Sequence, residues 1–220
     1  MIPVWTVRSD REALAETVAE SIAHTLLEAI ERRGRAFVAF AGGSTPAPAY
    51  ARLVEHPKLD WGKVVVTLTD ERLAPAGHPA RNEGLLEPFR SKGASFVPLE
   101  DEAAIARMPE FDSVLLGMGA DGHTASLFPG AGELETAMDP RGERAVLTIT
   151  PAELPPEAPF SRLTLTVPRL ARTRCCNIMI TGEAKKAIAE DAVKNGDPCD
   201  PPIRGVLHAL PVRPEFFWSP

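Results

Sequence analysis

Hydrophobic positions near the start of the chain follow a helical period. They recur every fourth residue, at Leu14, Val18, Ile22, Leu26 and Ile30. This spacing predicts a helix with one buried stripe. The segment Ser9-Asp10-Arg11-Glu12 has the pattern of a capping box with Ser9 as the cap, and Gly34 marks the end of the helix.

Short apolar runs rich in β-branched residues and leucine alternate with helix-length segments along the rest of the chain. Strands are predicted at 36–40, 63–69, 95–99, 113–116, 162–167, 175–181 and 205–208. Helices are predicted after Pro46, at 82–90 and at 183–194. The proline-rich residues 151–159 suit neither a helix nor an inner strand, and they connect 145–150 to the strand that follows. Strands separated by helices favour an α/β fold, in which a mostly parallel sheet is covered on both faces.

Composition adds bounds to this picture. The 220 residues are 44% hydrophobic and 25% charged, which is enough to bury a substantial core in a single domain spanning 1–220. The net charge of −6 gives no electrostatic reason to expect nucleic acid or an anionic membrane as a partner. Neither a signal segment nor an apolar run of roughly 18 residues is present, so we expect a cytoplasmic protein.

The cysteines and most of the histidines are predicted to be structural. Cys175 and Cys176 are adjacent in an apolar run, and with Cys199 they show no metal-ligand spacing. We therefore expect packing in a strand rather than a disulfide or a zinc site. A lone histidine is more often structural than catalytic, and this applies to His24, His56, His78 and His208.

One loop combines two residues that suit acid–base chemistry. The segment Gly117-Met118-Gly119-Ala120-Asp121-Gly122-His123-Thr124 follows the apolar run Val114-Leu115-Leu116. A buried strand that ends in glycines delivers Asp121 and His123 to the carboxyl edge of the sheet, where open α/β sheets bind ligands. Because an imidazole titrates near neutral pH and a carboxylate can fix its tautomer, His123 is a candidate general base. No third ligand stands at a recognisable spacing, so we expect no metal here.

The turn after the strand at 36–40 is suited to an anion. Gly42 and Gly43 allow a ligand to approach the backbone closely, and Ser44 and Thr45 add hydroxyl donors. Thr45 is placed to cap the helix that follows. The same residues are explained equally well by a tight, well-capped turn between a strand and a helix.

Two further strand ends carry cationic side chains. Asp70-Glu71-Arg72 follows the strand at 63–69, and the planar guanidinium of Arg72 suits a phosphate or a developing oxyanion. Lys185 falls in the first turn of the helix at 183–194. A lysine there opposes the helix dipole, which favours a role in binding an anionic ligand over a solvated face.

Taken together, these segments resemble the 6-phosphogluconolactonase family, which acts second in the oxidative pentose phosphate pathway. The resemblance is carried by Ala41-Gly42-Gly43-Ser44-Thr45-Pro46, Thr69-Asp70-Glu71-Arg72, Arg81-Asn82 and, most specifically, residues 117–129. It also includes Arg162 in Arg-Leu-Thr-Leu-Thr and Lys185 in Thr-Gly-Glu-Ala-Lys. The resemblance implies one Rossmann-like α/β domain, related to glucosamine-6-phosphate deaminases and ribose-5-phosphate isomerases, and no cofactor.

The resemblance supplies a substrate, a small sugar-phosphate lactone, and the residues suggest roles. His123, oriented by Asp121 or a backbone carbonyl, activates the attacking water. The oxyanion is stabilised by amides near Gly42 and Gly43 or by Arg72. Substrate binding falls to Gly42, Gly43, Ser44, Thr45, Asp70, Asn82, Arg162 and Lys185. A transient contact with glucose-6-phosphate dehydrogenase, which makes the lactone, stays open.

Two other functions stay open beside the lactonase. A deaminase or sugar-phosphate isomerase is the first, but in the deaminases a glutamate follows the loop histidine by five residues, and Phe128 stands there in this chain. Without that glutamate, His123 and Asp121 suit the activation of water better than proton relay through ring opening. A non-catalytic sugar-phosphate sensor is the second, and it is disfavoured because this chain has no basic extension for binding DNA.

Overall fold

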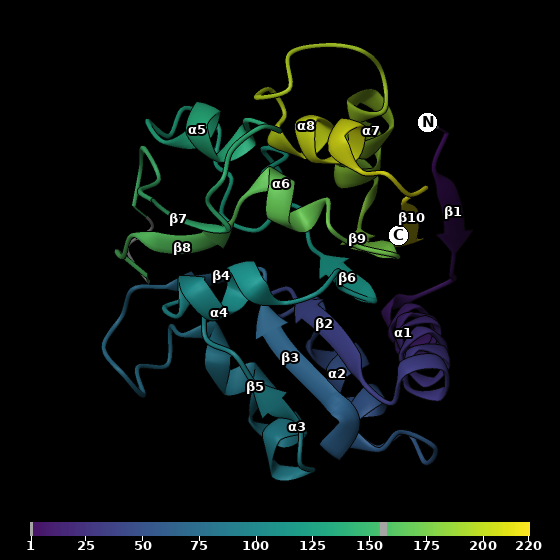
Figure 1. Ribbon diagram of the computed structural model, residues 1–220. Coiled ribbons are helices and arrows are strands. Elements are labelled where there is room, and N and C mark those ends of the chain that lie inside the picture. The colour runs from purple at the N-terminus through teal and green to yellow at the C-terminus, as the bar shows by residue number, and fades with distance from the viewer. Residues whose placement is uncertain (1, 155–157) are drawn as a thin grey trace.

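A sheet of seven parallel strands forms the centre of the computed structural model, which describes residues 2–154 and 158–220 (Figure 1). Across the sheet the order is β1 (Val4–Val7), β10 (Glu215–Ser219), β9 (Cys176–Thr181), β6 (Ser113–Leu116), β2 (Ala36–Phe40), β3 (Val64–Leu68) and β5 (Ser95–Phe96). Each strand is parallel to its neighbours. The predicted parallel sheet is confirmed.

Helices cover the sheet on both faces. The α-helices of the described residues are α1 (Arg11–Arg33), α2 (Ala47–Val54), α3 (Glu87–Ser91), α4 (Glu102–Arg107), α5 (Leu134–Met138), α6 (Val167–Leu170), α7 (Glu183–Ala192) and α8 (Pro202–Ala209). β3 and β6 are buried at every residue, which requires a cover on each face because alternate side chains point to opposite sides. Within the described residues, no helix combines the length and the hydrophobicity needed to cross a bilayer.

The helix predicted at the start of the chain is confirmed as α1, with a different cap. The carboxylate of Asp10 accepts hydrogen bonds from the backbone N–H groups of Glu12 and Ala13, at 3.0 and 2.9 Å. The capping role predicted for Ser9 is wrong, because the carboxylate of Asp10 accepts these two N–H groups and Ser9 donates to Asp10. Gly34 ends α1 in the left-handed conformation, at φ 73°. The helix packs against β2, β6, β9 and β10.

A small antiparallel sheet begins where β3 ends (Figure 1). Its strands run in the order β4 (Asp70–Arg72), β8 (Arg162–Leu165) and β7 (Val146–Ile149). The proline-rich connection predicted at 151–159 falls partly outside the described residues. Only Thr69 separates β3 from β4, so the small sheet holds Asp70 and Arg72 at the carboxyl edge of the main sheet.

The carboxyl-terminal part of the chain departs most from the predicted elements. The strand predicted at 205–208 is wrong, because these residues lie in α8. Ile203, Val206 and Leu207 are buried and spaced to share one helical face, so packing of that face favours the helix. The paired strands β1 and β10 have no counterpart among the predicted elements.

Candidate active site

The order in which the chain adds strands to the sheet reverses between the neighbouring strands β6 and β2. From β2 the chain continues to β3 and β5, whereas from β6 it continues the other way, to β9 and β10. Such a reversal leaves a crevice at the carboxyl ends of the two strands, and this is where α/β proteins bind ligands.

A cleft of about 300 Å³ lies at this edge of the sheet. Its volume falls at the small end of the range for ligand sites. It brings together residues predicted from five separate segments: Gly42, Gly43, Ser44, Thr45, Asp70, Arg72, Asn82, His123 and Lys185. Met118, Ala125 and Met179 also line the cleft and were missed, because small or apolar side chains carry no chemical signal in a sequence.

His123 and Asp121 form a hydrogen-bonded pair in the loop after β6. Nδ1 of His123 lies 2.6 Å from Oδ1 of Asp121, and the same oxygen accepts the backbone N–H of His123 at 3.1 Å. Burial raises the pKa of Asp121, but the hydrogen bonds and charge of His123 outweigh burial and hold that pKa below its ordinary value. An ionised Asp121 keeps the proton on Nδ1, which leaves Nε2 as the basic nitrogen.

Phe128 packs against this pair. The ring centroids of His123 and Phe128 are 4.4 Å apart. A phenyl ring exchanges no protons, so Phe128 gives His123 no further acid–base partner. The position at which the deaminases carry a glutamate is therefore filled by an apolar side chain.

The loop after β2 presents hydroxyl groups beside a left-handed glycine. Gly43 has φ 89°, a conformation that favours glycine. α2 begins at Ala47, its N-cap position is Pro46, and no side chain caps it. The capping role predicted for Thr45 is wrong because the helix starts one residue later. Thr45 and Ser44 line the cleft instead.

Arg72 and Asn82 are tied together at the cleft. Nη1 of Arg72 donates to Oδ1 of Asn82 and to the carbonyl of Ala80, both at 2.8 Å. The side-chain amide of Asn82 donates to the carbonyl of Asp70 at 2.9 Å. Gly42 makes room for this amide, because a Cβ there would lie 2.2 Å from Nδ2. Nε of Arg72 is buried and makes no hydrogen bond to a described residue, so the guanidinium keeps donor capacity for an anion.

Asp70 is held by hydroxyl groups below the cleft. Its Oδ2 accepts a hydrogen bond from Ser126 at 2.7 Å, and its Oδ1 accepts one from Thr69 at 3.3 Å. Ala125, next to Ser126, has φ 49°, which is strained for a residue with a Cβ. These contacts fix Asp70 as an acceptor at the cleft.

Lys185 and Arg162 are placed differently. Lys185 lines the cleft in the first turn of α7, while the next residue, Lys186, lies over the ring of Trp218, 4.3 Å from its centroid. Arg162 is only 4% exposed and does not line the cleft. Its guanidinium donates to the carbonyls of Ala158 and Phe160. Burial and the charge of neighbouring Arg72 lower the pKa of Arg162.

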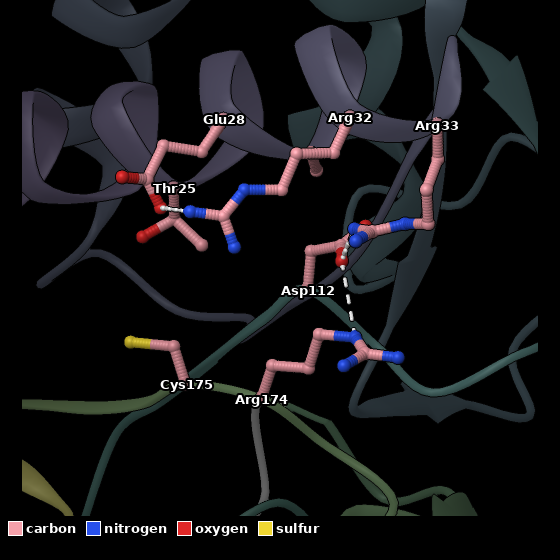
Figure 2. Close-up of a pocket in the computed structure, with 8 residues that line it drawn as sticks. Thr25, Glu28, Arg32, Arg33, Asp112, Arg174 and Cys175 are labelled. Carbon is pink, nitrogen blue, oxygen red and sulfur yellow. Dashed lines mark hydrogen bonds and ion pairs between the residues drawn. The ribbon is translucent and has the colours of Figure 1, made fainter.

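A second cavity, of about 330 Å³, lies at the opposite edge of the sheet (Figure 2). Its lining comes from the end of α1 and from residues just before β6 and β9: Thr25, Glu28, Ala29, Arg32, Arg33, Asp112, Arg174 and Cys175. Arg33 and Arg174 face the buried carboxylate of Asp112, and Arg32 faces Glu28. Because these arginines already have carboxylate partners at the amino edge, we place the active site in the cleft.

The residues predicted to be structural do not line the cleft. They are His24, His56, His78, His208 and the three cysteines. The three cysteines are free, and Cys176 is buried at the start of β9, as predicted. Cys175 precedes that strand and Cys199 lies in a loop; both are partly exposed. Within the described residues, no three His, Cys, Asp or Glu side chains are arranged to hold a metal ion.

The fold and the cleft define a class of protein, an α/β protein whose switch-point cleft is lined by a histidine hydrogen-bonded to an aspartate and by arginine and lysine side chains. The family model of glucosamine-6-phosphate isomerases/6-phosphogluconolactonase matches residues 9–218. The chain belongs to this family.

Named relatives cover nearly the whole chain. A 6-phosphogluconolactonase of Mesorhizobium japonicum is 40% identical, and the match covers 98% of this chain and 95% of that protein. One from Caulobacter vibrioides is 37% identical, with coverages of 95% and 94%. The crystal structure of a 6-phosphogluconolactonase from Shewanella baltica superposes with a TM-score of 0.88 at 33% identity, covering 100% of this chain and 98% of that chain. The predicted family and α/β fold are confirmed.

Proposed function

We propose that this protein hydrolyses 6-phospho-D-glucono-1,5-lactone to 6-phospho-D-gluconate in the oxidative pentose phosphate pathway. Relatives that are 37% and 40% identical carry the name of this activity. Within the chain, the proposal is carried by His123, which lines the cleft and is hydrogen-bonded to Asp121, with Phe128 against the imidazole. This arrangement suits one proton taken from water and returned to a leaving group.

Water is the nucleophile in the proposed mechanism. Nε2 of His123 takes a proton as the water oxygen bonds to the lactone carbonyl carbon, and the carbonyl electrons move onto oxygen. The bond from that carbon to the ring oxygen then breaks, and the imidazolium gives its proton to the ring oxygen. Asp121 stabilises the imidazolium between the two steps. The carboxylic acid formed loses its proton to solvent.

The other residues at the cleft bind and polarise the substrate. Ser44, Thr45 and Lys185 bind the phosphate, and Asp70 accepts hydrogen bonds from sugar hydroxyls. Arg72 serves both ends of the substrate, and one well-placed donor to the oxyanion is worth about 2 to 4 kcal/mol. Amides near Gly42 and Gly43 are the other oxyanion donors. Arg162, next to Arg72 across the small sheet, contributes positive charge from behind the cleft.

The proposal extends to the setting of the reaction. We place it in the cytoplasm, in one domain spanning residues 1–220, with no nucleic-acid partner. A transient contact with glucose-6-phosphate dehydrogenase would deliver the lactone before it hydrolyses spontaneously. Co-sedimentation of the two proteins tests the contact separately from the chemistry.

The rate at which freshly generated lactone disappears tests the function. Acid release is followed with and without the protein and corrected for spontaneous hydrolysis. We expect clear acceleration with the lactone and none with glucosamine 6-phosphate or ribose 5-phosphate. A folded protein that leaves the lactone rate unchanged would reject the proposal, and turnover of either other sugar would favour the deaminase or isomerase.

A further inference from the structure

Glu71 is a buried carboxylate between two residues of the cleft, and the proposed chemistry gives it no task. It is 1% exposed, and it does not line the cleft as Asp70 and Arg72 do. Its Oε1 accepts the backbone N–H of Arg72 at 2.6 Å and that of Asn82 at 2.7 Å. Its Oε2 accepts the backbone N–H of Glu83 at 2.8 Å.

These three hydrogen bonds join two separate segments of the chain. Arg72 belongs to β4, whereas Asn82 and Glu83 open the 3₁₀ turn Asn82–Leu86. The side chain of Asn82 accepts from Arg72 and packs against Gly42. The carboxylate of Glu71 therefore sets the position of the backbone that carries both partners of the Arg72–Asn82 hydrogen bond.

The environment of Glu71 is costly for a carboxylate. Burial raises its pKa, while the amides of Asn82, Arg72 and Glu83 and the charge of Arg81 act the other way. A buried carboxylate is stabilised when several N–H groups donate to it. A neutral amide of the same size would turn an NH₂ group toward one of these donors, and that donor would lose its partner.

We propose that Glu71 is a positioning residue, which holds Arg72 and Asn82 in the arrangement that binds the anionic substrate. The identity of that substrate rests on the function proposed above. Glu71 touches neither water nor lactone in this role, and its effect on binding passes through the guanidinium of Arg72.

Asp112 provides a matched control. It is also a buried carboxylate that accepts a backbone N–H, that of Phe37 at 2.9 Å, and it also faces arginines (Figure 2). It lies at the amino edge of the sheet, away from the cleft. Asp112→Asn thus reports the cost of disturbing a buried carboxylate without disturbing the site.

The first measurement compares Glu71→Gln with Asp112→Asn. We record KM and kcat for the lactone, the Kd of 6-phosphogluconate by calorimetry, and the Tm. Leaving one buried donor unpaired is expected to raise KM and Kd about tenfold in Glu71→Gln and to lower kcat as well, because Arg72 also faces the oxyanion in the proposed mechanism. Asp112→Asn is expected to lower the Tm with KM and Kd within about twofold. Unchanged KM and Kd in Glu71→Gln would overturn the proposal.

A double-mutant cycle shows whether Glu71 acts through Arg72. In an Arg72→Met background, Glu71→Gln should change Kd by less than about twofold, because the group it positions is gone. An equal increase in both backgrounds would refute the positioning role. If Glu71→Gln fails to fold, Glu71→Asp replaces it in the cycle with the same two outcomes, because the shorter carboxylate withdraws from the amides of Asn82 and Glu83.

Failure of the proposed function is recognised separately. If the wild-type protein does not accelerate lactone hydrolysis, that function is rejected by the wild-type rate alone. The Kd series needs no turnover and is then run with inorganic phosphate as the probe. A tenfold weaker Kd that depends on Arg72 still supports the role of Glu71, and an unchanged Kd still excludes it.

Discussion

His123 can act as a base only through the nitrogen that Asp121 does not occupy. Because Nδ1 lies 2.6 Å from Asp121, the proposed mechanism has Nε2 take the proton from water. We expect His123→Ala to lower kcat by about two to four orders of magnitude with little change in KM. Initial rates of acid release measure this, with His24→Ala, 76% exposed on α1, as the control. A kcat near that of the wild type would remove His123 from the mechanism.

Two adjacent lysines lie in different surroundings, so their variants distinguish the loss of a substrate contact from the loss of charge alone. Lys185 lines the cleft, whereas Lys186 lies over the ring of Trp218. A charge-assisted hydrogen bond is worth about 1.5 to 3 kcal/mol, so Lys185→Ala should raise KM between about tenfold and a hundredfold, with kcat nearly unchanged. Lys186→Ala carries the same loss of charge and should keep KM within about twofold. Equal effects in the two variants would contradict a specific phosphate contact.

At the level of single residues, the sequence predicts what a local motif contains. Asp121 and His123 are two positions apart in a glycine-rich loop, so their pairing follows from neighbours in the chain. The task of Glu71 depends on amides eleven and twelve positions away, which no local pattern contains. The direction of the Arg162 side chain is set by the carbonyls of Phe160 and Ala158, two and four positions before it, in a loop whose backbone path the residue types alone do not give.

Among the elements, strands between helices could be predicted best. The strand predicted at 113–116 is observed with the same bounds, because its apolar run is buried throughout and ends at glycines. α8 was mistaken for a strand because a short apolar run at 205–208 fits either period when its packing partner is unknown. β1 gains its place only by pairing with β10 at the far end of the chain.

The loop that carries Asp121 and His123 depends on a glycine for its shape. A Cβ at Gly119 would lie 2.2 Å from the ring of His123 and 2.5 Å from Oδ1 of Asp121. In Gly119→Ala the pair must shift, and a displacement of about 1 Å at a reacting group can cost about a hundredfold in rate. We expect kcat to fall by that order. Gly132→Ala, where a Cβ meets nothing within 4 Å, is the control for the same change. Steady-state kinetics measure kcat for both variants, and equal kcat values in Gly119→Ala and Gly132→Ala would contradict this account.

Across the whole molecule, the two edges of the main sheet have separate tasks. At the carboxyl edge Nε of Arg72 is buried without a described partner, and at the amino edge Arg33 and Arg174 face Asp112.

The small sheet connects to the rest through a further ion pair. Arg144, just before β7, donates to both carboxylate oxygens of Glu102 in α4, at 2.5 and 2.6 Å. This pair links the stability of the molecule to pH.

Arg144→Met should remove a pH-dependent part of the stability. The hydrogen bond and charge of Arg144 lower the pKa of Glu102 from its ordinary 4.5. A lowered carboxyl pKa stabilises the folded state above the ordinary value, and this contribution is lost as pH falls through the folded-state pKa. The wild type should therefore have a higher urea midpoint than Arg144→Met above about pH 5.5, and the gap should close below 4.5.

Arg141→Met is the matched comparison for this pH dependence. Arg141 precedes the same strand, but its side chain is 91% exposed and its ion pair with Asp139 is longer, at 3.6 Å. Exposed pairs contribute little, so the Arg141→Met midpoint should follow the wild type at every pH. A gap for Arg144→Met that persists unchanged below pH 4.5 would assign the loss to packing of the long side chain rather than to the charge of Glu102. If the difference in urea midpoint between the wild type and Arg144→Met closes below pH 4.5, and Arg141→Met shows no such difference, the Arg144–Glu102 ion pair is the pH-sensitive link between α4 and the small sheet.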